Sequence, residues 1–151
     1  CVMHTHTSAG LGVATQKDGL LPLTQMALAV IANTGYHDYE GPAFDLEERE
    51  RLISDLQNLN ILILRNHGLL TVGKTVAEAF MWMYRAERAC RFQLSFQKAG
   101  AEAQQISKSV QEVSIERARK AIGSTGHRPI GDFEWPALIR KLHRQNPGFD
   151  Q

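Results

Sequence analysis

The chain has 151 residues, of which 43% are hydrophobic and 22% charged, and its formal net charge is +1. That length and apolar content suit a single globular domain with a substantial core, and the balanced charge argues against nucleic acid or an anionic membrane as the main partner. Two cysteines far apart give no disulfide framework, and no apolar run reaches the roughly 18 residues of a membrane span, so we expect a cytoplasmic protein that binds a small molecule.

The first predicted element is a strand in residues 1–7, which carries two histidines two positions apart. Alternate side chains of a strand point to the same face, so His4 and His6 should lie together, close enough to share one ion. A His-x-His pair on its own is more often a hydrogen-bonded feature than a set of ligands. A catalytic zinc site usually has three protein ligands and an open position, so a third ligand is needed.

Two short helices are predicted next. Small and apolar residues in 8–17 indicate a helix behind the first strand, with Thr7 or Ser8 as its N-cap. Capping is the commoner role for such a threonine, and the alternative is a place near a metal. After a turn that contains a proline, Thr24 is expected to cap a second helix in residues 25–30.

A polar, titratable segment follows the second helix. It contains Tyr36, His37, Asp38, Tyr39 and Glu40. We expect a loop here, in which such side chains usually satisfy backbone groups. The alternative is that one of them takes part in catalysis.

A helix, a strand, a turn and a second strand come next. Apolar residues at helical spacing, with acidic residues in the first turn, indicate a helix in residues 45–59 whose charges face solvent. The apolar run 61–64 indicates a buried strand, and residues 69–73 indicate its partner. His67 lies in the turn between them, where Gly68 allows a sharp bend, and it is our candidate for the third ligand.

The rest of the chain is predicted to be largely helical. Residues 75–99 form the longest element, in which residues 81–83 are core or subunit contacts rather than a cofactor site. Glu87 and Arg91 have the spacing of an ion pair on one helix face.

Beyond Gly100 a weakly apolar linker leads to a polar helix in residues 109–122. The Gly-Ser-Thr-Gly segment 123–126 is expected to be a plain loop rather than a phosphate cradle. Residues 132–142 have the pattern of an amphipathic helix, and its apolar side should pack across the domain or against a neighbouring subunit.

Four segments match, in order and spacing, the motifs of a known family. They are HTHT at residues 4–7, GLLPL at 19–23, YHDYEG at 36–41 and NHGLL at 66–70. On these motifs the chain resembles the class II aldolase/adducin family from its first residue to about Lys98. The resemblance implies an α/β fold, a three-layer α/β/α sandwich around a central mixed β-sheet, in residues 1–99, with residues 100–151 as a helical C-terminal extension.

The resemblance also implies a chemistry. Members of the family bind a divalent metal, usually zinc, through three histidines, which here are His4, His6 and His67, and manganese or iron are the alternatives. As aldehyde-lyases they cleave or rearrange small sugar phosphates or related carbonyl compounds through a metal-stabilised enediolate, and they commonly form homotetramers. Around the substrate pocket we expect Gln25, Tyr36 and His37.

The chain departs from the family pattern in two places, and the second departure favours a different function. The family's N-terminal portion, with an acidic residue near the metal and a Gly/Ser phosphate-binding region, has no match, so we expect an N-terminally truncated chain and assign no catalytic base. The region that gives a neighbouring subunit a tyrosine or aspartate reads Thr24, Gln25 and Met26, which carry protons poorly.

The alternative function is a non-enzymatic interaction domain, like the head of adducin, with assembly or cytoskeletal contacts. The three histidines favour the enzyme, because adducin heads do not keep this set. An unrelated amidohydrolase barrel also carries a His-x-His pair, but such a barrel needs about 200 residues.

Overall fold

A four-stranded mixed sheet lies at the centre of the computed structural model, which describes residues 1–41, 46–122 and 130–151. Its strands are β1 (Val2–Thr5), β2 (Thr34–His37), β3 (Ile61–Leu64) and β4 (Gly68–Val72), in the spatial order β1-β4-β3-β2. Strand β4 runs antiparallel to both of its neighbours, whereas β2 runs parallel to β3.

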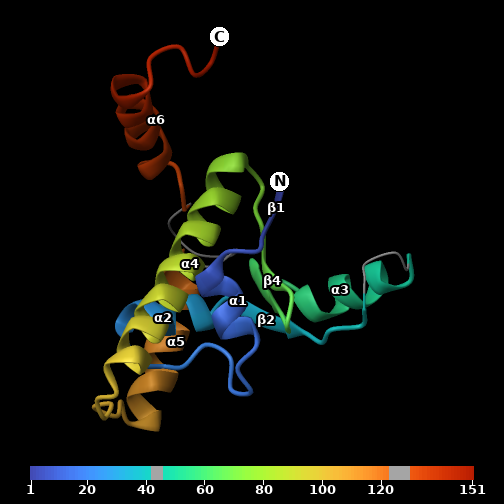
Figure 1. Ribbon diagram of the computed structural model, residues 1–151, viewed down its shortest axis with the longest axis vertical. Coiled ribbons are helices and arrows are strands. Elements are labelled where there is room, and N and C mark those ends of the chain that lie inside the picture. Colours follow the sequence, from blue (N-terminus) through green and yellow to red (C-terminus); the bar gives the residue numbers. More distant parts are fainter. Residues whose placement is uncertain (42–45, 123–129) are drawn as a thin grey trace.

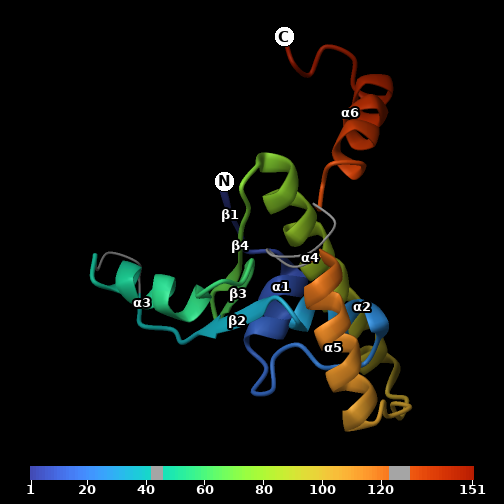
Figure 2. The same ribbon diagram turned by 180° about the vertical axis from the view of Figure 1, so that it is seen from behind.

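Helices cover the sheet from two sides (Figures 1 and 2). The helices α1 (Ser8–Ala14), α2 (Gln25–Ile31) and α4 (Val76–Ala99) lie on one side, and α3 (Glu48–Leu56) lies on the other. Strand β3 is buried on both faces: Ile61 and Ile63 join the core beside α4, and the alternation of a strand turns Leu62 and Leu64 toward α3. The three-layer α/β/α sandwich predicted from the sequence is confirmed.

Residues 34–37 form a strand, which includes the first two residues of the segment 36–40 that we expected to be a loop. They have no alternating pattern, and what makes them a strand is parallel pairing with β3, from Thr34 opposite Ile61 to His37 opposite Leu64. Gly35 also lets helix α3 come close, because a Cβ atom there would lie 2.7 Å from the carbonyl oxygen of Asp55. The titratable segment therefore starts inside the sheet.

Helix α4 supplies the centre of the core. Trp82 is fully buried, and Met81 and Met83 beside it are almost so, which confirms that this stretch is core. The helix begins after Thr75, whose hydroxyl accepts a hydrogen bond from the Glu78 backbone N–H, and it ends at a left-handed glycine.

Threonines also cap the first two helices, as predicted. The Thr7 hydroxyl accepts a hydrogen bond from the Gly10 N–H at 3.1 Å, and Thr24 caps α2 in the same way. Helix α1 ends at Ala14, earlier than expected; the Thr15 hydroxyl donates to the Leu11 carbonyl, and the chain then enters a turn.

The C-terminal part consists of α5 (Lys108–Ile122), which packs on α2, and α6 (Glu134–Gln145). Helix α6 lies beyond the N-terminal end of α4 (Figures 1 and 2) and meets it through Trp135, whose ring is 5.4 Å from that of Phe80. Further along, Leu138 and Leu142 are exposed, so the expected packing of α6 across the domain is limited to its first turn. The Gly-Ser-Thr-Gly segment lies outside the described residues.

None of the described helices is long and apolar enough to cross a membrane.

Candidate metal centre

Three histidines meet where the outer strand β1 pairs with β4. His4 lies opposite Leu70 in the antiparallel register, and the turn between β3 and β4 brings His67 beside the end of β1. The three ring centroids are 4.5 to 4.9 Å apart, and one nitrogen from each ring lies within 4.8 Å of the others. The structure therefore brings together the three residues predicted as ligands, with His6 directly after the last residue of β1.

The turn that carries His67 depends on unusual backbone geometry. Asn66 has a φ of 57° and Gly68 a φ of 145°, conformations that asparagine and glycine adopt most readily. A Cβ atom at residue 68 would collide with the carbonyl oxygen of Thr5 on β1. The glycine thus allows the turn to approach the strand with the other two histidines.

A backbone carbonyl orients the His4 ring. Its Nδ1 atom lies 2.9 Å from the Leu69 carbonyl oxygen, and because a carbonyl only accepts, Nδ1 carries the proton and donates it. Nε2 then has a lone pair that can bind a metal, as is usual for ligand histidines held by a second partner. In the structure this Nε2 accepts a hydrogen bond of 2.7 Å from Nε2 of His6, so a metal would replace that proton. Nitrogens bound to one tetrahedral zinc are roughly 3.3 Å apart, so small ring rotations would accommodate an ion.

The electrostatics of the cluster keep the third ring neutral. Burial, followed by the neighbouring His4 and His6, lowers the pKa of His67, and among the neighbouring groups only the Glu48 carboxylate acts to raise it. A neutral imidazole is the form that binds metal. His4 and His6 are exposed and His67 is half-buried, so the cluster is open toward solvent on one side. The donor set and its exposure fit one divalent ion with a free coordination position.

A hydrogen bond between two side chains connects the segment after β1 to helix α4. The Thr7 hydroxyl donates a hydrogen bond of 2.5 Å to a carboxylate oxygen of Glu87, in addition to capping α1. We had expected Glu87 to pair with Arg91, and no ion pair between these two is present in the described part of the chain. The longer-range partner is reached because α1 packs along α4.

None of the residues expected in a substrate pocket contributes a ring or nitrogen to the cluster, although His37 is among the groups that act on His67 electrostatically. Gln25 begins α2 and lines a different cavity, between α2 and α4. The Tyr36 hydroxyl accepts a hydrogen bond from the Leu20 N–H at 3.0 Å, and its ring lies under the Arg65 guanidinium. His37 is buried against α3. A place for these three in the substrate pocket stays a prediction.

Two residues near the cluster are not among the predicted ligands or pocket residues. One is Tyr39, which belongs to the polar segment 36–40 noted in the sequence: its ring centroid is 6.4 Å from that of His67, and the residue is 55% exposed. Glu48 affects His67 electrostatically and lies beside His37, although its place in the first turn of a helix suggested only a solvent-exposed charge. For Glu48 the sequence carries no signal that distinguishes it from the acidic residues next to it.

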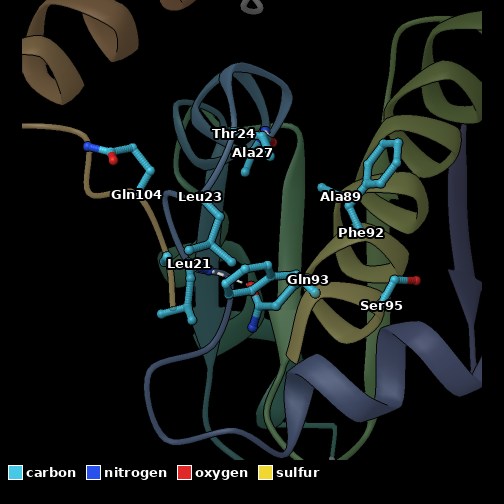
Figure 3. A pocket seen from close by; sticks show the side chains of 11 residues that line it. Leu21, Leu23, Thr24, Ala27, Ala89, Phe92, Gln93, Ser95 and Gln104 are labelled. Carbon is cyan, nitrogen blue, oxygen red and sulfur yellow. Dashed lines mark hydrogen bonds between the residues drawn. The ribbon is translucent and has the colours of Figure 1, made fainter. Parts of the chain in front are cut away.

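A separate apolar cavity of about 430 Å³ lies between the start of α2, the second half of α4 and the segment after it (Figure 3). On its wall the Gln93 side chain accepts a hydrogen bond from the Leu21 N–H and donates to Gln16 Oε1 and the Gly19 carbonyl. This amide is therefore saturated within the protein. None of the lining residues is a histidine, so the cavity is distinct from the candidate metal centre.

Comparison with known sequences gives a consistent result. Residues 1–94 match the family model described as Class II Aldolase and Adducin N-terminal domain. A Pseudomonas aeruginosa protein with the provisional name aldolase class 2 protein is 46% identical over the whole of this chain, which covers 58% of that protein. Alpha-adducin of Mus musculus is 35% identical over 94% of the chain and 20% of its own length.

Solved structures agree with this relationship. The crystal structure of an aldolase II superfamily protein from Pseudomonas syringae superposes with a TM-score of 0.85 at 45% identity, covering 96% of this chain and 57% of the other. An L-fuculose 1-phosphate aldolase from Glaciozyma antarctica has the same fold, with a TM-score of 0.69 at 22% identity over 95% of this chain and 53% of its own. The chain thus spans a little over half the length of its bacterial relatives.

Proposed function

Because this chain belongs to the class II aldolase and adducin family, we propose that it is the metal-binding part of a divalent-metal-dependent, aldolase-type lyase. The observation that carries the proposal is the cluster of His4, His6 and His67, with one nitrogen of each within 4.8 Å of the others. Zinc is the expected metal because three imidazoles and an open position suit it, and manganese or iron are the alternatives. The expected substrate is a small sugar phosphate or a related carbonyl compound.

The protein's own residues would prepare this site in three ways. The Leu69 carbonyl fixes the His4 ring with Nε2 free, the lowered pKa of His67 keeps its ring neutral, and the exposed side leaves room for a substrate. A bound divalent ion would act there as a Lewis acid on a substrate oxygen. We assign no acid or base among the described residues.

A second function is supported by a different observation. Alpha-adducin matches 94% of the chain at 35% identity. Thr24, Gln25 and Met26 also occupy the region where the family resemblance implies a proton-transferring residue. An adducin-like interaction domain would need no metal. Whether the histidine cluster binds a metal therefore distinguishes the two functions.

Elemental analysis of the purified full-length protein tests the proposal. We expect about one zinc, manganese or iron per chain, lost when His4, His6 or His67 is replaced by alanine. Phosphorylated sugars would then be screened for cleavage that depends on the bound metal. A metal-free protein after expression in metal-supplemented medium, or full metal content in the His67→Ala variant, would refute the proposed site and favour the adducin-like function.

We further propose that residues 100–151 are a helical extension that contributes to a cytoplasmic homo-oligomer, with a homotetramer expected from the family. The exposed Leu138 and Leu142 on α6 support this, because an apolar helix side usually packs on something. Deletion of residues 132–151 should lower the mass measured by light scattering or the melting temperature. Unchanged mass and melting would count against a role in assembly.

A further inference from the structure

The polar junction between β2 and α3 is built around one imidazole. His37, the last residue of β2, is 4% exposed, and its Nδ1 atom lies 2.8 Å from an Asp55 carboxylate oxygen. Its Nε2 atom faces Glu48 at 3.4 Å, within ion-pair range, and makes no hydrogen bond. Helix α3 has no buried residue of its own. A buried imidazole between two carboxylates is therefore one of the few inward contacts that hold this helix on the sheet.

The main chain of the same residue holds the turn that carries the third histidine. The His37 carbonyl accepts a hydrogen bond of 2.8 Å from the Arg65 N–H, two residues before His67. His37 also stands opposite Leu64, the last residue of β3. The end of β2 thus contacts the start of the turn 65–67 through a backbone hydrogen bond and through its pairing with β3.

The three histidine rings differ in how they are fixed. His4 is held by the Leu69 carbonyl and by its place opposite Leu70 in the β1–β4 register, and His6 follows directly after the last residue of β1. Among the described residues no hydrogen bond reaches the His67 ring, so its position depends on the turn. The Asn66 N–H also donates to the Ala14 carbonyl at 3.1 Å, so the end of β2 is one of two segments whose movement would displace this ring.

We propose that His37 is a positioning residue for His67. Held between Glu48 and Asp55, its side chain fixes the end of β2, and its carbonyl group thereby fixes the turn. The inference rests on the proposed function, because it takes His67 as a metal ligand. Residues that directly orient ligand histidines change metal affinity by about 10- to 100-fold, and His37 acts through the backbone, so we expect the lower end, about tenfold.

The test compares three variants of the full-length protein. His37→Asn keeps an amide donor near the position of Nδ1 and removes the group that faces Glu48, and Glu48→Gln removes the same contact from the exposed helix. Glu50→Gln, two residues along α3, is the matched control with the same change of charge. Zinc affinity is measured by competition with a chromophoric chelator, and the visible absorption of the cobalt-substituted protein reports ligand geometry.

We expect His37→Asn and Glu48→Gln to weaken zinc binding about tenfold and to alter the cobalt spectrum, while Glu50→Gln changes neither. Unchanged affinity and spectrum, with only a lower melting temperature of the metal-free protein, would reduce His37 to a structural role. An equal effect of Glu50→Gln would attribute the loss to overall charge and overturn the inference. If His37→Asn does not fold, the cobalt spectrum of Glu48→Gln decides, because the Glu48 charge also acts directly on His67 and affinity alone would not separate the two effects. A wild-type protein without metal would overturn the proposed function together with this inference.

Discussion

Replacing Thr7 by valine tests how the strand with the two clustered histidines is fixed to the helices. The change keeps the shape of the side chain but removes its hydroxyl, which caps α1 at 3.1 Å and donates to the Glu87 carboxylate at 2.5 Å. Loss of an N-cap costs about 1 kcal/mol, and loss of a hydrogen bond to a charged group about 2 kcal/mol. We therefore expect the free energy of unfolding to fall by about 3 kcal/mol.

Urea denaturation of the metal-free full-length protein measures this change without a contribution from metal binding. Thr7→Ser retains the hydroxyl and should lose less than about 1 kcal/mol, the range of a conservative cap replacement. If valine costs no more than serine, the hydroxyl does not hold this junction and the reasoning is wrong. If Glu87→Gln alone lowers the free energy of unfolding as much as Thr7→Val does, the cap on α1 contributes nothing measurable to stability.

Three further predictions follow from the same geometry. Gly68→Ala forces a Cβ atom against the Thr5 carbonyl at a φ of 145° and should cost about 3 kcal/mol with loss of metal binding, so wild-type stability and metal content would contradict the close approach. The pKa of His67 lies below the ordinary value of 6.5 for an unfolded chain, so the unfolded state binds a proton on this ring more readily than the folded state. The metal-free protein should therefore lose stability as the pH falls below 6.5. His67→Gln should weaken this pH dependence of the melting temperature. Burial, with help from Glu87, raises the pKa of Cys90 to about 12, so mass spectrometry after mild alkylation of the native protein should find Cys1 modified and Cys90 intact.

The histidine cluster could be predicted because its parts obey local rules. His4 and His6 share a face through the two-residue period of a strand, and His67 follows a buried apolar run that had to end in a turn. What the sequence does not contain is the pairing of β1 with β4, which brings the two parts together across more than sixty residues. The resemblance to a family supplied that link.

Polar contacts between distant segments are the main feature that the sequence did not predict. The Thr7 to Glu87 hydrogen bond spans 80 residues, and the contacts of His37 reach Glu48 and Asp55 on another element. Periodicity finds apolar faces, but it cannot tell which of several acidic residues on a helix meets a buried partner. For the same reason Glu87 was assigned to Arg91, its nearest opposite charge on the helix.

Strand β2 and helix α6 show the limit of local pattern in two other ways. Residues 34–37 become a strand through their neighbour β3 and not through their own composition. Helix α6 was predicted as an amphipathic helix in nearly the right place, but its pattern does not specify the surface that its apolar side meets. In both cases the outcome depends on a segment distant in sequence: the strand that pairs with residues 34–37, and the surface on which the apolar side of α6 packs.

The placement of the two tryptophans allows two events to be followed by fluorescence. Trp82 is sealed in the core, so its emission should change only when the domain unfolds. Trp135 sits at the start of α6 against Phe80, and its emission should respond to any movement of that helix. With Trp82→Phe and Trp135→Phe as single-tryptophan forms, the release of the C-terminal helix becomes separable from the melting of the fold that carries it.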